Sequence, residues 1–492
     1  MVLLAIVLLP IMGTVYFGFF GSRRGAPLIN VGLSLATFAL SVDIAISVLE
    51  HGPILYAGEQ LYADAFSALF IALTGFVGAT TSVFSLRYMQ IQERNGYVTA
   101  DRTKVYLSLY QVFILTMLLV LVSNNLGLLW VALEGATLAT VLLVAWSRSP
   151  SSVKAAWKYF ILCGVGIAQA LFGTILLYFA AEKMLGPGGT ALLWTHLNGV
   201  KTQLEPTVIG LAFVFFIVGY GTKVGLVPLH SWLPDAHAEG PTPISAVLSG
   251  LLLNAALYAI LRVKVLADGT LHNNLPSHLL MGFGLISMLL GSLSMWNRQD
   301  IKRLFAYSSI EHMGLSAFSF GLGGSMGAFA GLLHMTAHSL VKSSLFFVVG
   351  HVVQMSGTQK IGGIRNLLVR IPSLGWALVA GGFAITGTPP FAIFASEFLI
   401  VTNAVRKAIW SVPFILLALL VTFGVVMKRI LEMGKDSQNT ASFPVRDDNK
   451  QALALGPIWL HFGLALIIGL FFPLQLANWF HTAILSIGLA HG

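Results

Sequence analysis

The ionisable side chains inside apolar stretches are the residues of this chain whose types could do chemistry. Glu134 stands within the apolar run 128–135, and Lys223 follows the small residues 219–222. A charged side chain at bilayer depth costs about 2.5–3.5 kcal/mol on insertion scales, so each one needs a reason to be there. A glutamate and a lysine suit an ion pair, and a lysine that loses its partner can release a proton near neutral pH. The pair therefore predicts a switchable proton relay.

A second set of polar residues recurs at helical spacing. His334, His338 and Lys342 stand at i, i+4 and i+8, which places them along one stripe of a helix. Histidine titrates near neutral pH, so the stripe is interpreted as a proton wire. A purely structural role is the alternative. Metal binding by the two histidines is disfavoured because a lysine follows one turn later.

Two more residues complete the predicted relay. Glu397 comes shortly after Pro389-Pro390 and is expected to be the terminal exchange group, the alternative being an interfacial glutamate. His230 stands close to Pro228, near the membrane surface, and either takes up protons or fixes a loop. Because Pro228 and His230 still lie beyond Lys223, snorkelling of that lysine to the interface is disfavoured.

Six further polar residues are candidates for an accessory role: Lys158, His237, Glu239, Asn254, Glu311 and His312. No catalytic residue and no metal site is predicted. The sequence contains no phosphate-binding loop, hydrolase elbow or metal-binding cysteine set, and Cys163 alone cannot hold an iron–sulfur cluster. The chain is therefore expected to lack redox chemistry and ATP hydrolysis of its own.

The elements that position these residues follow from composition. Of 492 residues, 56% are hydrophobic and 10% are charged, whereas soluble domains carry roughly 25% charged residues. A membrane-spanning helix needs about 20 apolar residues, which predicts an all-α polytopic membrane protein with about fourteen transmembrane helices. The predicted spans are 2–20, 26–49, 65–87, 105–122, 125–147, 156–181, 207–230, 243–261, 277–297, 304–322, 326–355, 372–403, 411–427 and 455–475.

Two of these spans are predicted to be broken, the seventh near Pro228 and the twelfth at 386–391, because proline removes a backbone donor and clashes with the preceding turn. In lipid such breaks survive only where protein or water satisfies the freed carbonyls. Interrupted helices in corresponding positions point to a transport site between inverted repeats. The predicted domains are 1–104 (helices 1–3), 105–266 (first five-helix repeat), 267–435 (second five-helix repeat) and 436–492 (helix 14 and tail).

The formal charge of +9 arises mostly from Lys and Arg in short loops. This pattern indicates membrane topology and not nucleic-acid binding. The positive-inside rule predicts an N-terminus outside, with the loop that holds Arg23 and Arg24 in the cytoplasm. We expect a multi-pass protein of the bacterial cytoplasmic (inner) membrane.

Several motifs resemble the signature of the proton-conducting antiporter-like family. This family includes antiporter-like subunits of respiratory complex I, Mrp-type cation/proton antiporters and membrane-bound hydrogenases. The motifs are residues 219–237, 239–243 and 300–310, together with the His334, His338 and Lys342 stripe. The resemblance extends over residues 65–430, approximately.

The resemblance implies roles by position. Glu134 matches the family's fifth-helix glutamate, and Lys223 matches its seventh-helix lysine. His334 and His338 match central relay positions, and Glu397 matches the twelfth-helix exit residue. The fold implied has two inverted five-helix repeats with broken helices 7 and 12.

Two positions distinguish this chain within the family pattern. Many relatives carry a lysine or histidine where this chain has Asn254, which cannot titrate, so the link between the halves needs water or another group. The run 310–313, Ile-Glu-His-Met, resembles most the F subunit of hydrogenase-4-type complexes.

The resulting expectation is a proton-translocating subunit of a redox complex of the group 4 hydrogenase or formate hydrogenlyase type. The alternatives are a complex I or Mrp-type subunit, with sodium as the ion, a subunit of a proton-driven inorganic-carbon uptake complex, and a structural scaffold. The expected partners are other membrane and peripheral subunits, protons and the lipid bilayer, with no nucleic acid. No cofactor is expected in this chain, whereas partner subunits would carry iron–sulfur and nickel–iron or flavin centres.

Overall fold

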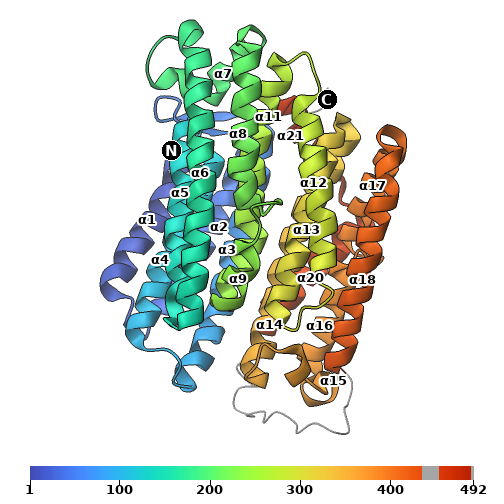
Figure 1. The fold of residues 1–492 in the computed structure, drawn as a ribbon. Helices are drawn as coiled ribbons and strands as arrows, with labels where there is room; N and C mark the ends of the chain where they lie inside the picture. Colours follow the sequence, from blue (N-terminus) through green and yellow to red (C-terminus); the bar gives the residue numbers. More distant parts are fainter. Residues whose placement is uncertain (435–453, 489–492) are drawn as a thin grey trace.

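Long apolar helices run side by side through the computed structural model, which describes residues 1–434 and 454–488 (Figure 1). Eleven of these helices are long and apolar enough to cross a membrane, or up to 12 if one bent pair counts as a span. The prediction of an all-α polytopic membrane protein is confirmed, whereas the number fourteen stays a prediction. The predicted domain boundary at 435 lies outside the described residues.

The first part of the chain forms six long helices and a small hairpin. The helices are α1 (Val2–Phe20), α2 (Ala26–His51), α3 (Ala65–Arg94), α4 (Ala100–Val122), α5 (Leu126–Val144) and α6 (Pro150–Leu185). The hairpin pairs β1 (Ile54–Tyr56) with β2 (Leu61–Ala63) in antiparallel register and was not predicted. Helices α4 and α5 are joined by residues 123–125 alone and form a tight helical hairpin.

The seventh predicted span is broken, as its prolines indicate. After the short α7 (Trp194–Val200), α8 (Pro206–Val224) ends at Gly225, whose φ of 84° lies in the left-handed region that terminates helices. The chain then forms α9 (Trp232–Glu239) and α10 (Thr242–Val247), followed by α11 (Leu253–Thr270). A π-helical turn, Leu248–Leu252, joins α10 to α11, and such turns often mark functional sites.

The second part contains the other predicted break, between α16 and α17. Its helices are α12 (Leu275–Ser294), α13 (Ile301–Leu322), α14 (Gly324–Ser356), α15 (Leu367–Arg370), α16 (Pro372–Ile385), α17 (Ala392–Lys407), α18 (Val412–Gly434), α20 (Leu455–Phe471) and α21 (Leu474–Ile487). Helices α20 and α21 meet at 85°. Helix α13 has 22 residues but is not among the eleven candidate spans, because Glu311, His312 and its serines lower its hydropathy.

Glycines bring two helix pairs into backbone contact. A Cβ atom on Gly284 of α12 would lie 2.5 Å from the backbone nitrogen of Phe318 in α13. In the first half, a Cβ atom on Gly219 of α8 would lie 2.7 Å from the carbonyl of Gly166 in α6. Small residues permit this approach, which is the usual basis of tight packing in membranes. Helices α6 with α8, and α12 with α13, therefore form closely packed pairs.

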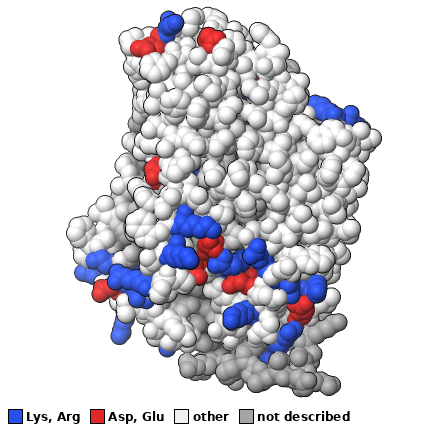
Figure 2. All heavy atoms as spheres, viewed as in Figure 1, with Lys and Arg blue, Asp and Glu red and all other residues white. Residues whose placement is uncertain are grey.

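Two segments lie in the centre of the bundle. The most apolar stretches of Thr242–Thr270 and Gly324–Ser356 are each 100% buried inside the bundle. The corresponding stretch of α1 is 28% buried. Lys and Arg side chains gather toward the lower end of the face shown in Figure 2, below a wide band with few charges. An uncharged band of this kind is what contact with lipid requires.

A buried ion pair fastens α11 to the start of α3. Both terminal nitrogens of Arg262 donate to the carboxylate of Asp64, each over 2.7 Å, and the side chains are 4% and 0% exposed. The guanidinium lies over the ring of Trp194 at 4.4 Å and over that of Tyr258 at 5.0 Å. This bidentate, ring-enclosed arrangement sets the position of the central helix that carries Asn254.

Candidate proton-relay site

Lys223 lies fully buried in the last turn of α8, directly before the helix break. Its ammonium lies 5.7 Å from the ring centroid of Tyr159 on α6. The Tyr159 ring stacks on Trp232 of α9 at 4.4 Å, and the indole of Trp232 donates to the carbonyl of Thr222 over 2.8 Å. The aromatic pair thus holds the two sides of the break together around the lysine.

Glu134 is linked to Lys223 through a threonine. The Lys223 ammonium donates to the Thr137 hydroxyl, and that hydroxyl donates to Oε2 of Glu134 over 3.1 Å. Thr137 is fully buried, whereas Glu134 is only half-buried. The structure thus brings together the two residues that the sequence pairs. Thr137 was missed, although its position three residues after Glu134 places it on the same helix face.

In the second half, three helices contribute to one hydrogen-bonded chain. Nδ1 of His312 on α13 lies 3.1 Å from Nε2 of His334 on α14, so one of the two nitrogens donates to the other. Nδ1 of His334 lies 2.9 Å from the hydroxyl of Ser396 on α17. On the other side, Nε2 of His312 lies 3.4 Å from Oε2 of Glu311. Ser396 was not predicted; His334 is the middle member of this chain, and Glu311 lies beyond its His312 end.

The predicted wire along α14 is not made by direct hydrogen bonds. His338 is fully buried, and neither ring nitrogen has a hydrogen-bond partner among the described residues. The ammonium of Lys342 donates to the carbonyl of Phe305 on α13 over 2.8 Å. Residues four apart on a helix share a face but stand about 5–6 Å apart, too far for imidazoles to bond directly. The direct contacts of His334 and Lys342 therefore run across to α13.

Glu397 lies on α17 against the second helix break. It is 7% exposed, and its Oε1 has no hydrogen-bond partner within the described residues. Gly387, in the break itself, has a φ of 60°, and a Cβ atom there would overlap the Glu397 carboxylate. Gly387 is therefore needed both for its backbone conformation and for the space that the carboxylate occupies.

Charged side chains from α6, α9 and α13 form a cluster between the two halves. Nζ of Lys158 on α6 donates to Oδ2 of Asp235 on α9 over 2.8 Å, and Arg303 of α13 bonds to the other carboxylate oxygen. Glu239 accepts a hydrogen bond from the Ser151 hydroxyl over 2.9 Å. These side chains line a cavity of about 720 Å³. Half-buried His230 precedes α9, near this cluster.

His237 and Asn254 both contact α14 from the first half. The ring of His237 is fully buried and stacks on Phe346 at 4.8 Å, and neither nitrogen has a hydrogen-bond partner in the part of the chain described. The Asn254 amide donates to the Ser339 hydroxyl over 2.7 Å and to the Met335 carbonyl over 3.0 Å. The two residues therefore join the halves at the central helix.

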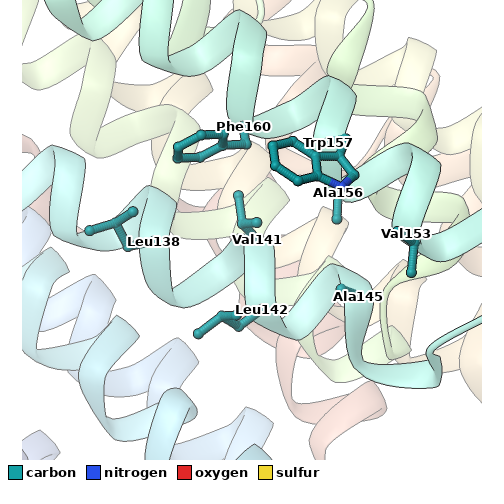
Figure 3. Close-up of a pocket in the computed structure, with 8 residues that line it drawn as sticks. All are labelled: Leu138, Val141, Leu142, Ala145, Val153, Ala156, Trp157 and Phe160. Atoms are coloured by element: carbon teal, nitrogen blue, oxygen red, sulfur yellow. The ribbon is translucent and has the colours of Figure 1, made fainter.

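An apolar groove lies beside the helix that carries Glu134. It has a volume of about 340 Å³ and lies between α5 and α6, as Figure 3 shows. Leu138 is 51% exposed and Trp157 is 60% exposed. The lining residues are Leu138, Val141, Leu142, Ala145, Val153, Ala156, Trp157 and Phe160. The groove is thus an open surface on the same side of α5 as the half-buried Glu134, one turn further along.

Comparison with known proteins places this geometry in a family. The chain is 43% identical over 482 residues to a hydrogenase-4 component F homolog of Methylacidiphilum infernorum (isolate V4), which covers 98% of this chain and 99% of that protein. A chain of the membrane-bound sulfane sulfur reductase, an archaeal respiratory membrane complex, is 25% identical with a TM-score of 0.86, over 99% of this chain and 97% of that one. A chain of respiratory complex I from Thermus thermophilus shares the fold, at 20% identity and a TM-score of 0.82 over 100% of both chains.

The family model that matches is described as "NADH:quinone oxidoreductase/Mrp antiporter, TM" and covers residues 123–427. That range contains the broken helices α8/α9 and α16/α17 and all the residues of the predicted relay. The chain belongs to this family of antiporter-like membrane subunits.

Proposed function

We propose that this chain is the proton-translocating membrane subunit of a multi-subunit redox complex of the group 4 hydrogenase or formate hydrogenlyase type. The observation that carries the proposal is the series of ionisable side chains that begins at half-buried Glu134 and continues through the buried Lys223 and His334 to Glu397. Buried ionisable groups in membrane helices are typical of proton relays. Likeness to the hydrogenase-4 component F homolog along 98% of the chain supports the choice of complex.

The first half would work as a switch. With its proton, Lys223 is held through Thr137 against the charge of Glu134. If a change in a neighbouring subunit moves Glu134 or its hydroxyl bridge, the buried ammonium loses this support and releases its proton. Glu134 is half-buried, so it lies where a neighbour can act on it.

The two halves would exchange protons at α14. Asn254 cannot carry a proton, but its Oδ1, both nitrogens of His237 and both nitrogens of His338 lack hydrogen-bond partners among the described residues. Buried polar groups of this kind are normally satisfied by ordered water. We infer that water at these groups completes the path past Asn254, with His237 and His338 as titratable steps.

Other subunits would cover the groove between α5 and α6 and supply the redox chemistry. A half-buried carboxylate beside an open apolar groove is costly against lipid, and a neighbouring membrane subunit removes that cost. Iron–sulfur and nickel–iron centres would lie in peripheral partners, because Cys163 is the one cysteine of this chain. Electron transfer there would drive the switch at Glu134.

The topology belongs to the same proposal. We place 105–266 and 267–435 as two inverted repeats, each with its broken helix, after the N-terminal helices 1–104 and before the segment 436–492. The N-terminus would lie outside a bacterial cytoplasmic membrane, which puts the cluster of Lys158, Asp235 and Arg303 on the cytoplasmic side. The 720 Å³ cavity would then serve proton uptake, with His230 beside it.

Purification of the intact complex through a tag on this chain tests the assignment. Mass spectrometry and metal analysis are expected to find a nickel–iron subunit with iron–sulfur proteins. A flavin and NADH module, a set of Mrp-type subunits or a zinc-containing soluble subunit would each contradict the assignment and favour complex I, sodium/proton exchange or inorganic-carbon uptake, respectively.

A further inference from the structure

Glu311 is a fully buried carboxylate near the middle of α13. Neither oxygen has a hydrogen-bond partner within the described residues, and a buried charge without partners is strongly unfavourable. Its helix cannot easily move, because a Cβ atom on Gly291 of α12 would lie 2.8 Å from the backbone nitrogen of Glu311. The carboxylate is thus held in place by packing, and a neighbouring polar group must account for it.

Lys342 on α14 is the cation toward which Glu311 leans. Contacts between His312 and His334 and between Phe305 and Lys342 show that α13 and α14 run antiparallel. Helical side chains lean toward the start of their own helix, so Glu311 and Lys342 lean toward each other. The Lys342 ammonium has three donors, and the Phe305 carbonyl takes one of them.

On its other side Glu311 faces a pair of neighbouring imidazoles, those of His312 and His334. His312 has Glu311 at Nε2, 3.4 Å away, and His334 at Nδ1, 3.1 Å away. His334 has His312 at Nε2 and the Ser396 hydroxyl at Nδ1, 2.9 Å away. An imidazole placed in this way accepts a proton at one nitrogen and releases another from the opposite nitrogen.

We propose that Glu311 is the counter-ion of Lys342 and a proton carrier of the second half, with His312 as its acceptor. This inference rests on the proposed proton translocation and adds α13 to its path. It gives the second half a lysine–glutamate pair of its own, in addition to Lys223 and Glu134 in the first half.

The transfer is balanced at each step. Once the ammonium has swung from the Phe305 carbonyl to the carboxylate, a Lys342 N–H bond breaks as an O–H bond forms on Glu311, which leaves both groups neutral. The Glu311 O–H bond then breaks as His312 gains a proton at Nε2 and passes its Nδ1 proton to Nε2 of His334. The Nδ1 proton of His334 goes to the Ser396 oxygen, which releases its own hydroxyl proton toward the second helix break. Each imidazole is left in the other tautomer, and a proton must leave Nε2 and another reach Nδ1, by exchange with water, before the next transfer.

The test uses the intact complex in proteoliposomes, with protons moved per electron as the readout. Glu311→Gln keeps the size of the side chain but cannot carry a proton, and we expect transport through this subunit to fall about 100-fold. His312→Gln, which removes the acceptor, is expected to give the same loss. Glu50→Gln at the exposed end of α2 is the matched control and should transport protons like the wild type.

A second pair of variants separates proton transfer from a structural role. Glu311→Gln leaves the Lys342 ammonium buried without its counter-ion, so the Tm of the complex should fall. Adding Lys342→Met removes that unpaired charge and should restore the Tm, while proton transport stays lost. A double variant no more stable than Glu311→Gln alone would overturn the ion pair, and this comparison holds even if the single variant assembles poorly.

The outcomes also distinguish this inference from the proposed function. If Lys223→Ala stops proton transport while Glu311→Gln transports protons at the wild-type ratio, the carrier role of Glu311 is wrong and the proposed function stands. If Lys223→Ala and Glu311→Gln both transport protons at the wild-type ratio, the proposed function itself fails.

Discussion

The ammonium of Lys223 and the carboxylate of Glu134 are joined through the hydroxyl of Thr137, which accepts from the lysine and donates to the glutamate. A bridging hydroxyl of this kind transmits the charge of one group to the other and can be broken by a small movement. In a direct ion pair, by contrast, the ammonium and the carboxylate themselves would have to move apart before the lysine lost its partner. The bridge makes the first half sensitive to small shifts of α5 relative to α8.

Thr137→Val tests the bridge, because valine has nearly the same shape and no hydroxyl. A hydrogen bond to a charged group contributes about 1.5–3 kcal/mol, so we expect proton transport by the intact complex to fall roughly tenfold or more. Thr137→Ser should transport protons close to the wild-type rate. Thr37→Val is the control, since the Thr37 hydroxyl donates to the Leu33 carbonyl of its own helix. Equal transport by Thr137→Val and Thr37→Val would show that the bridge has no function.

Gly387→Ala should displace the carboxylate of Glu397. A methyl group at this position overlaps the carboxylate, in addition to the strain of about 1–2 kcal/mol from a positive φ. Gly357→Ala carries the same backbone strain at a φ of 68° but has open space around it. We expect proton transport to be lost in Gly387→Ala and retained in Gly357→Ala. Equal loss of proton transport in Gly387→Ala and Gly357→Ala would mean that backbone strain alone, and not overlap with the Glu397 carboxylate, explains the loss.

Arg262→Ala should destabilise the protein by about 3–5 kcal/mol, because it leaves Asp64 as a buried charge without a partner. Arg262→Lys should recover little of the lost stability, since an ammonium cannot form the two parallel hydrogen bonds to the Asp64 carboxylate. Thermal unfolding in detergent measures both variants. Glu59→Gln is the comparison and should change the Tm only slightly, because Glu59 pairs with His196 at the surface, where the two side chains are 48% and 36% exposed. Equal Tm values for Arg262→Ala and Glu59→Gln would contradict a locking role.

Leu138→Cys tests whether another subunit covers the groove between α5 and α6. The native Cys163 is fully buried, so a membrane-permeant thiol reagent should report the introduced cysteine. We expect modification in the isolated subunit and protection in the intact complex. Leu420→Cys on α18, where the side chain is 68% exposed, shows that the reagent reaches membrane-facing positions. Equal modification of Leu138→Cys in both preparations would exclude a neighbour at this groove.

Much of this arrangement could be predicted from the sequence because membrane insertion leaves strong local signals. Prolines located both helix breaks, and charges inside apolar runs identified Glu134 and Lys223. Contacts between helices carry no comparable signal. The i, i+4, i+8 spacing places His334, His338 and Lys342 on one stripe of α14 but could not show which residues of α13 lie against it. Ser396 and Thr137 escaped notice because a single hydroxyl within an apolar helix usually bonds to its own backbone.

The sequence also did not show that the side chain of Glu134 is only half-buried. Hydropathy places a residue at a depth in the membrane but does not say which side of its helix faces the bundle. Helices α5 and α6 are apolar over most of their circumference, so neither side is marked by composition. The open groove at Leu138 and Trp157 became visible only with the packing of the two helices.

Proton movement driven by electron transfer, measured with Lys223→Ala in the assembled complex, tests the central claim most directly. The complex is reconstituted in proteoliposomes, and protons moved are counted against electrons transferred, beside Glu134→Ala and the wild type. The relay predicts that both variants assemble and transfer electrons but lose the protons that this subunit contributes. A wild-type ratio of protons to electrons in both variants would contradict a relay through Lys223 and Glu134.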